Sequence, residues 1–264
     1  MSLFIRLSDS DLCFARYEAS TPTDFDFATF HLAPQASLTL NLRGAMQQVG
    51  LLQHDFDRVE VLAGSAVTPV PLADFQEEDA AAFYRFCFEP EARQRVFYDT
   101  VPSVNAVFLF ALPESVCHAL EETFGEGRVR YTAALTPVVQ TFAGKGLGTS
   151  ESRRIFVYVH DDRAEIVVLE AGRLLMQNSF TVQSLTDISY YTFNMVRHLA
   201  IDISSTPVFV AGPTLLRDPV VTEFQQYAAK VFPIHPAADF NRHIVATTDG
   251  VPYDLVCALL RRRV

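Results

Sequence analysis

The stretch SRRIFVYVHDDRAEIVVLEAGRLLMQNSFTVQSLTD, residues 152–187, alternates apolar and polar side chains in three successive runs. The alternation predicts strands over Arg154–His160, Glu165–Glu170 and Arg173–Val182, because successive side chains of a strand point to opposite faces. Connections of two or three residues between these runs favour antiparallel neighbours. The stretch therefore predicts a sheet that opens a lobe of the protein.

A helix is expected directly after this sheet. Ser184 or Thr186 suits the N-cap position, and Asp187 stands in the first turn, where the helix dipole stabilises a carboxylate. Apolar residues then recur at helical spacing from Ile188 to Leu199. The remaining elements expected in this half are a strand at Val208–Ala211, a helix at Pro219–Lys230, a strand at Val231–Ile234 and a closing helix at Tyr253–Arg262. The order is β-β-β-α-β-α-β-α.

The first half of the chain begins in the same order. Its expected elements are strands at Leu3–Ser8, Leu12–Glu18 and Phe27–Leu32, a helix over the apolar stripe Leu38–Leu52, and a strand at Val59–Ala63. From the first strand to the strand after the helix there are 59 − 3 = 56 residues here and 208 − 154 = 54 residues in the second half. The matching order and length predict an internal duplication.

The first half carries further material after Ala63. Its expected elements are a strand at Val67–Pro71, a helix at Asp79–Phe88, a polar stretch ending near Ser103, a strand at Ala106–Leu112, a helix at Glu114–Phe124, a strand at Arg128–Ala134 and a helix at Leu135–Phe142. The small, polar segment AGKGLGTSES, residues 143–152, contains three glycines and predicts a linker. We therefore expect a first lobe over residues 1–146, with an insertion near 64–103, and a second lobe over residues 150–264.

The composition excludes several classes of function. The net charge of −10 disfavours nucleic acid and anionic membranes as partners, since both repel an acidic surface. The longest apolar run, Ala106–Leu112, is too short for insertion into a bilayer. The four cysteines are widely separated, which predicts neither a zinc site nor a disulfide framework. No signal peptide is visible at the start of the sequence, so a cytoplasmic protein is expected.

Two lobes that each open with three antiparallel strands, followed by a helix and parallel strands, resemble the actin-like ATPase fold. That fold is a duplicated ribonuclease-H-like unit of the α/β class with mixed sheets. The segments LFIRLSDSDLCFARYEA (3–19) and IFVYVHDDRAEIVVLEAGRLLMQNSF (155–180) carry the resemblance. On these segments the chain is similar to a bacterial family of unknown function with this fold, and in outline to pilus-assembly proteins of the PilM type. The resemblance implies a nucleotide cleft between the lobes.

Active members of that superfamily resemble one another at three turns, of the types D-x-G, D-x-G-G-G-T and G-G-[ST]. Glycine lets backbone N–H groups approach a phosphate, and aspartate holds Mg²⁺. The corresponding segments here are Ser8–Asp11, His160–Arg163 and Gly212–Thr214. The first two contain acidic residues in place of glycine, and in the third Pro213 has no N–H to offer. These departures predict that phosphate binding at the three turns has been lost.

The leading hypothesis is therefore a degenerate actin-like protein, a pseudo-ATPase with no catalytic residue and no cofactor, that acts as a protein-binding or scaffold module. An alternative is a nucleotide-binding ATPase or phosphotransferase that uses the interlobe cleft. Under that alternative ATP and Mg²⁺ would contact the candidate residues Asp9, Asp11, Asp161, Asp162 and Gly212, and Lys145 could reach a phosphate. A third hypothesis is a small-molecule binder that uses the cleft without chemistry.

Three other motifs are interpreted as structural. In AGKGLGTS the lysine precedes the last two glycines and a strand follows, unlike a P-loop. His235, Asp239 and His243 fit no standard metal-ligand spacing. His160 and Asp161 are neighbours at a strand end, where successive side chains are expected to point apart, which disfavours a catalytic pair.

Overall fold

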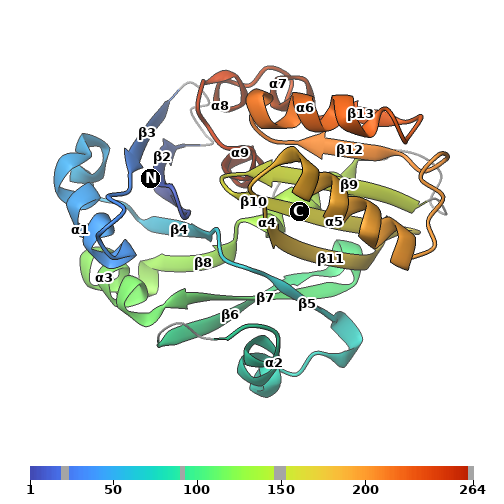
Figure 1. Ribbon diagram of the computed structural model, residues 1–264. Coiled ribbons are helices and arrows are strands. Elements are labelled where there is room, and N and C mark those ends of the chain that lie inside the picture. The colour runs from blue at the N-terminus through green and yellow to red at the C-terminus, as the bar shows by residue number, and fades with distance from the viewer. Residues whose placement is uncertain (19–23, 90–92, 146–152, 261–264) are drawn as a thin grey trace.

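Two five-stranded sheets and one three-stranded sheet make up the fold (Figure 1). The computed structural model describes residues 1–18, 24–89, 93–145 and 153–260. The first-lobe sheet has the strand order β3-β2-β1-β4-β8, and the second-lobe sheet has the order β11-β10-β9-β12-β13. Each contains both parallel and antiparallel pairs, so the predicted α/β class with mixed sheets is confirmed.

The first-lobe sheet is built from strands expected along the first half of the chain. They are β1 (Ser2–Leu7), β2 (Asp11–Tyr17), β3 (Phe25–His31), β4 (Arg58–Ala63) and β8 (Val129–Ala133). β1 pairs antiparallel with β2 and parallel with β4, so the chain must cross over between β3 and β4. Helix α1 (Leu38–Gln48) and the 3₁₀ helix η1 (Gly50–Gln53) make that crossing.

The second-lobe sheet has the same arrangement. Its elements are β9 (Arg153–His160), β10 (Arg163–Glu170), β11 (Arg173–Thr181), α5 (Leu185–His198), β12 (Val208–Ala211), α6 (Thr214–Phe224) and β13 (Val231–Pro233). β9 pairs antiparallel with β10 and parallel with β12, just as β1 pairs with β2 and β4. This is the order that an internal duplication would produce. Ser184 and Asp187 form a capping box at the start of α5.

Helix α6 differs from the prediction. It begins at Thr214 and ends at Phe224, whereas the sequence predicted a helix over Pro219–Lys230. Pro219 lies inside the helix, where its missing N–H leaves the carbonyl of Leu215 without a helical partner. Leu215 is exposed, so water can offset the lost hydrogen bond. The expectation that this proline begins the helix is therefore wrong.

The insertion after β4 forms the third sheet. Strands β5 (Thr68–Pro71), β7 (Ala106–Pro113) and β6 (Gln94–Val101) lie in that order, and helix α2 (Ala80–Cys87) packs on one face. β6 occupies the polar stretch ending near Ser103, for which no strand was predicted. It forms because its apolar side chains pack on β7, as in the rings of Phe97 and Phe110, which stack at 5.6 Å. Helix α3 (Glu114–Phe124) then leads to β8.

The last helix of each lobe packs against the other lobe. Helix α4 (Leu135–Gly144) places the ring of Phe142 4.7 Å from that of Phe156 in β9 and 5.5 Å from that of Phe209 in β12. Helix α9 (Tyr253–Leu260) lies in a buried cluster with side chains of β2 and β4, and it also contacts α4. The two helices therefore cross between the lobes and tie them together.

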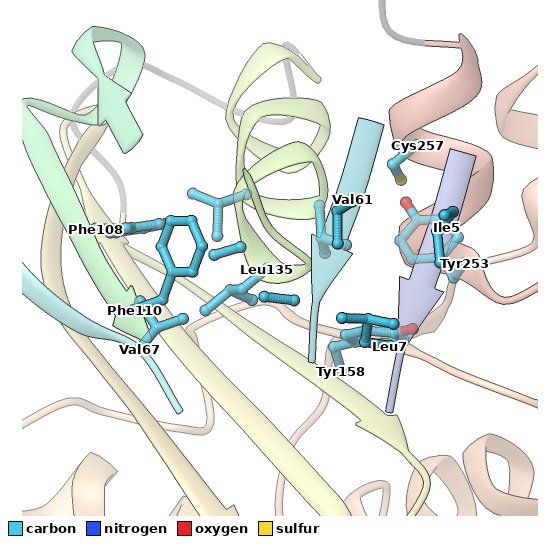
Figure 2. Close-up of a cluster of buried hydrophobic side chains, with 14 of the residues drawn as sticks. Ile5, Leu7, Val61, Val67, Phe108, Phe110, Leu135, Tyr158, Tyr253 and Cys257 are labelled. Atoms are coloured by element: carbon cyan, nitrogen blue, oxygen red, sulfur yellow. The ribbon is translucent and has the colours of Figure 1, made fainter. Parts of the chain in front are cut away.

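One hydrophobic core runs through both lobes (Figure 2). It joins Ile5 and Val61 of the first-lobe sheet to Tyr158 of the second-lobe sheet and to Tyr253 and Cys257 of α9. Two short helices, α7 (Pro236–Asp239) and α8 (Ile244–Thr247), lead from β13 to α9. None of the helices that the structure describes has the length and apolar character needed to cross a membrane.

The backbone of Gly212, after β12, approaches β9 so closely that a side chain has no room. Its φ angle is 141°, and a Cβ atom would lie 2.3 Å from the carbonyl oxygen of Val159. We therefore expect Gly212→Ala to lower the free energy of unfolding by about 2–4 kcal/mol, because backbone strain and a clash with backbone add together. Urea unfolding followed by circular dichroism measures the change.

The matched control is Gly127→Ala, since a Cβ at Gly127 would meet nothing within 4 Å. Its free energy of unfolding should stay within about 0.5 kcal/mol of the wild type. An equal loss of stability in the two variants would contradict the proposed cause.

Candidate functional site

The two hairpin turns that the sequence singled out meet at the boundary between the lobes. One joins β1 to β2 and the other joins β9 to β10. The hydroxyl of Ser10 donates a hydrogen bond to Oδ1 of Asp161 at 2.7 Å. The guanidinium of Arg163 donates from Nε and Nη2 to Oδ2 of Asp9, at 3.1 and 3.0 Å. The turns are thus joined directly to each other by side chains.

Arg6 lies behind these turns, near the end of β1, and connects three elements. Its Nε donates to both carboxylate oxygens of Asp254 on α9, at 3.0 and 2.8 Å. Its Nη2 donates to Oδ2 of Asp161 at 2.8 Å, and its Nη1 lies 3.5 Å from Oδ1 of Asp11. One guanidinium therefore links β1, the β9–β10 turn and the helix that crosses from the second lobe.

The burial of this arginine explains why it needs such partners. Arg6 is 1% exposed and Asp254 is fully buried, so neither charge is stabilised by bulk water. Burial acts to lower the pKa of Arg6, but the attraction of Asp254, and then of Asp161, outweighs it and holds that pKa well above its ordinary value. The guanidinium is therefore a permanent cation inside the protein.

His160 adds a second buried positive charge. Its Nδ1 lies 3.0 Å from Oδ2 of Asp161, and its Nε2 lies 3.8 Å from Oε1 of Glu165 on β10. Burial lowers the pKa of His160, yet the hydrogen bonds with Asp161 and Glu165 dominate and raise it to about 9, against repulsion from Arg6. A pKa of about 9 favours the protonated form at neutral pH, in which Nδ1 donates to Asp161 although Nη2 of Arg6 lies 3.3 Å from the same nitrogen.

The expectation that His160 and Asp161 point apart is wrong. Asp161 has a φ angle of 49°, so it is not part of the strand and the alternation of side chains does not apply to it. Burial raises the pKa of its carboxyl, but the hydrogen bond from His160 and the charge of Arg6 prevail and hold that pKa well below its ordinary value. The Asp161 carboxylate is thus charged and fully engaged.

The third turn, after β12, lies beside the end of β9 in the second-lobe sheet. β12 is parallel to β9, and Gly212 packs against the backbone of Val159, one residue before His160. Pro213 then precedes the first residue of α6 and supplies no N–H. Gly64 is the counterpart in the first lobe, because it follows β4 and its N–H donates to the carbonyl of Leu7 in β1 at 2.8 Å. Both glycines serve close packing between neighbouring strands.

The five candidate cleft residues have different surroundings. Asp9, Asp11 and Asp161 come together in the interlobe cluster described above. Asp162 is exposed, and its carbonyl accepts a hydrogen bond from the N–H of Val182 at 2.7 Å. Whether these residues contact a nucleotide stays a prediction.

Lys145, which could reach a phosphate under the alternative hypothesis, instead forms an ion pair with Asp239. His243 accepts a hydrogen bond at Nδ1 from the N–H of Val245 and lies 3.3 Å from the hydroxyl of Tyr17 through Nε2. In the described ranges of the chain, histidine, cysteine, aspartate and glutamate do not form a group of three that could hold a metal ion. The remainder of the linker, residues 146–152, lies outside the described residues.

Sequence reasoning missed Arg6 and Asp254. Each was visible as a lone charge in an apolar segment: Arg6 between Ile5 and Leu7 in β1, and Asp254 in the closing helix YDLVCALL. A charge in such a segment requires a buried partner. The signal was therefore present in the sequence, but the identity of the partner was not.

Each positive charge of the cluster is paired with at least one carboxylate, and the carboxylates outnumber the cations. Arg6 and protonated His160 face the carboxylates of Asp11, Asp161 and Asp254, while Arg163 faces Asp9 outside them. An anionic ligand would have to displace these carboxylates from their hydrogen bonds before it reached a cation. The arrangement is suited to holding the lobes together.

The Arg6–Asp254 pair predicts a large effect on stability when one partner is removed. We expect Asp254→Asn to lower the free energy of unfolding by about 3 kcal/mol, because it leaves a buried guanidinium with one counter-charge fewer. Guanidinium chloride unfolding measures the loss. The control is Glu122→Gln, in the pair of Arg43 and Glu122, whose side chains are 61% and 73% exposed. That change should cost less than about 0.5 kcal/mol, and a similar loss in both variants would refute the assignment.

Protonation of His160 predicts a fall in stability on the alkaline side. Because its folded pKa of about 9 lies above the ordinary 6.5, the stabilisation is complete below pH 6.5 and is lost as pH rises through 9. We expect the free energy of unfolding to fall by about 1.5 kcal/mol between pH 6.5 and 8. We limit the pH range to 8 because Asp57 raises the pKa of the amino terminus of Met1 from 8.0. Above pH 8 that second group would add its own loss of stability to that of His160.

Chemical unfolding at a series of pH values tests this expectation. His160→Gln should remove the fall, and the matched variant His54→Gln, at an exposed position, should keep it. Should the His160→Gln protein retain the wild-type slope, another group must cause it.

The comparisons with known proteins agree with this architecture. A Bacteroides thetaiotaomicron protein described as having an actin-like ATPase fold and unknown function matches with 24% identity and a TM-score of 0.80, over 94% of this chain and 96% of that one. A chain of the PilM-PilN type IV pilus biogenesis complex matches with 13% identity and a TM-score of 0.56, over 98% of this chain and 97% of that one. No curated protein matched. Residues 1–231 match the family described as Protein of unknown function (DUF3822), and the chain belongs to that family.

Proposed function

We propose that this protein is a degenerate actin-like protein that does not hydrolyse ATP efficiently and acts by binding another protein. The observation that carries the proposal is the set of contacts between the two hairpin turns. Ser10 bonds to Asp161, and Arg163 bonds to Asp9, in the place where the actin-like fold is expected to receive phosphate groups. The chain's own charged side chains are thus paired with one another there.

The chemistry of these turns supports the loss of phosphate binding. Backbone N–H groups bind a phosphate when small residues leave room for it and their dipoles converge on it. Asp9 and Asp161 instead bring carboxylates, which repel a polyphosphate. The buried cations close by are already paired, Arg6 with Asp254 and Asp161 and His160 with Asp161. A nucleotide would have to break these ion pairs before its phosphates could contact the guanidinium of Arg6.

The connections between the lobes support a binding role without catalysis. An ATPase of this fold class is expected to open and close its cleft, and motion of that kind needs a weak interlobe contact. Here the crossing helices α4 and α9, the continuous core and the Arg6 ion pairs all join the lobes. A protein held in one arrangement presents a constant surface, which suits a scaffold.

The four cysteines are free, which fits the reducing cytoplasm.

The proposal predicts that nucleotides do not stabilise the protein. A ligand that binds only the folded state raises the melting temperature. Because we propose that nucleotides do not bind, we expect ATP or ADP with Mg²⁺ to change it by less than about 1 °C. Differential scanning fluorimetry measures the shift, and phosphate release should equal that of a heat-inactivated sample.

A shift of several degrees that disappears in Asp9→Ala and in Asp161→Ala would establish the alternative function, nucleotide binding in the interlobe cleft. The control for these variants is Asp202→Ala. Asp202 is exposed and bonds only to serines and threonine in its own loop, so its removal leaves the interlobe turns intact.

A further inference from the structure

Helix α2 in the insertion has an exposed aromatic face. Phe86 is 91% exposed and Phe83 is 42% exposed, and their spacing of three residues places them on one side of the helix. The opposite side is occupied by Ala80 and Tyr84, which are buried against the sheet β5-β7-β6. The hydroxyl of Tyr84 also donates to the carbonyl of Ala66 at 3.4 Å, which fixes the helix on the sheet.

Folding does not account for the position of these phenylalanines. Burial of a phenylalanine side chain contributes about 1.5–3 kcal/mol, and Phe86 makes almost none of this contribution in the isolated chain. It is the most exposed large hydrophobic side chain among the residues that the structure describes. Its neighbour Tyr84 already anchors the helix, so a polar residue at position 86 would leave the packing on the sheet unchanged.

An acidic segment precedes the same helix. Asp74, Glu77, Glu78 and Asp79 are all exposed, and no ion pair within the described ranges involves any of them. With Arg85, residues 74–86 carry a net charge of −4 + 1 = −3. The segment is therefore an uncompensated negative charge beside an exposed apolar face.

Aromatic rings join the acidic segment to the sheet beneath α2. The ring of Phe75 lies 4.9 Å from that of Tyr98 on β6, and the proximity of Glu77 raises the pKa of Tyr98. Tyr98 pairs with Leu109, so it lies on the sheet face that α2 covers. We call the surface formed by Phe83, Phe86 and the acidic segment 74–79 the α2 face. In Figure 1 helix α2 lies at the outer edge of the insertion.

We propose that the α2 face is the docking site for an amphipathic segment of a partner protein, in which apolar side chains stand next to lysine or arginine. This inference rests on the proposed function and names the surface and the class of partner. Exposed aromatic side chains are the groups that contribute most at protein interfaces, and uncompensated carboxylates attract a basic segment and orient it. The charge of the face thus selects a basic occupant.

Fluorescence anisotropy with two labelled synthetic peptides tests the proposal. One is an amphipathic peptide of leucine and lysine, and the other has glutamate in place of every lysine. We expect the basic peptide to bind about tenfold more tightly than the acidic one, with an advantage that declines in high salt. Failure of the basic peptide to bind, or equal binding of the two peptides, would overturn the proposal.

Variants assign the binding to the α2 face. Phe86→Ser should weaken binding of the basic peptide about tenfold, since it removes the central apolar contact. Glu78→Lys together with Asp79→Lys should shift the preference toward the acidic peptide. The matched control is Leu215→Ser on α6, a side chain that is 89% exposed, which should leave the affinity within about twofold of the wild type. Circular dichroism shows whether each variant is folded.

Each remaining outcome has a distinct meaning. Binding that is lost in Leu215→Ser but kept in Phe86→Ser would overturn the α2 face while leaving partner binding as the function. Self-association of the wild type in sedimentation experiments, abolished by Phe86→Ser, would identify a second copy of the chain as the occupant and overturn the proposed class of partner. Nucleotide binding, by contrast, would be detected only in the separate melting experiment, so a failure of the proposed function can be distinguished from a failure of the docking site.

Discussion

The buried guanidinium of Arg6 is the constraint on which the arrangement of the two lobes depends. A cation that is 1% exposed must have counter-charges, and the chain supplies them from Asp254 on the closing helix and from Asp161 in the second-lobe turn. Neither carboxylate belongs to the sheet that carries the arginine. Because an unpaired buried charge is costly, any movement that separates the lobes must either break these pairs or bring in water. The same interaction that satisfies one side chain therefore fixes the relative position of two large parts of the molecule.

Hydrophobic packing reinforces this constraint. Phe142 at the end of α4 is packed against two rings of the second-lobe sheet, and α9 is packed against the first-lobe sheet. Each crossing helix buries apolar surface that its own lobe would otherwise leave exposed. The charge pairs give direction to a contact that the hydrophobic effect makes strong, since dispersion and burial are not directional but hydrogen bonds are. His160 extends the charge network into the second-lobe sheet through Glu165.

The functional consequence follows from what occupies the turns. In a protein that binds phosphate at this place, small residues leave backbone N–H groups available to the ligand. Here Ser10, Asp9 and Arg163 use the same space for contacts between the lobes. Under the proposed function, the actin-like framework is kept while these turns serve contacts between the lobes instead of phosphate binding. The exposed side of α2, in the insertion, carries the aromatic and acidic groups on which the proposed partner binding rests.

The sequence by itself determined the elements that depend on local patterns: the three strands that open each lobe, a helix start near Ser184 or Thr186 and the absence of glycine from the two hairpin turns. These follow from side-chain alternation, capping and backbone freedom, which act over a few residues. Tertiary structure alone decided that β6 forms, that α6 begins at Thr214, before Pro219, and that His160 contacts Asp161. It also decided the partner of Arg6, which lies 248 residues away along the chain. A lone charge in an apolar strand shows that a counter-charge is required, but many carboxylates could supply it, and only the packing of the whole chain brings Asp254 within reach.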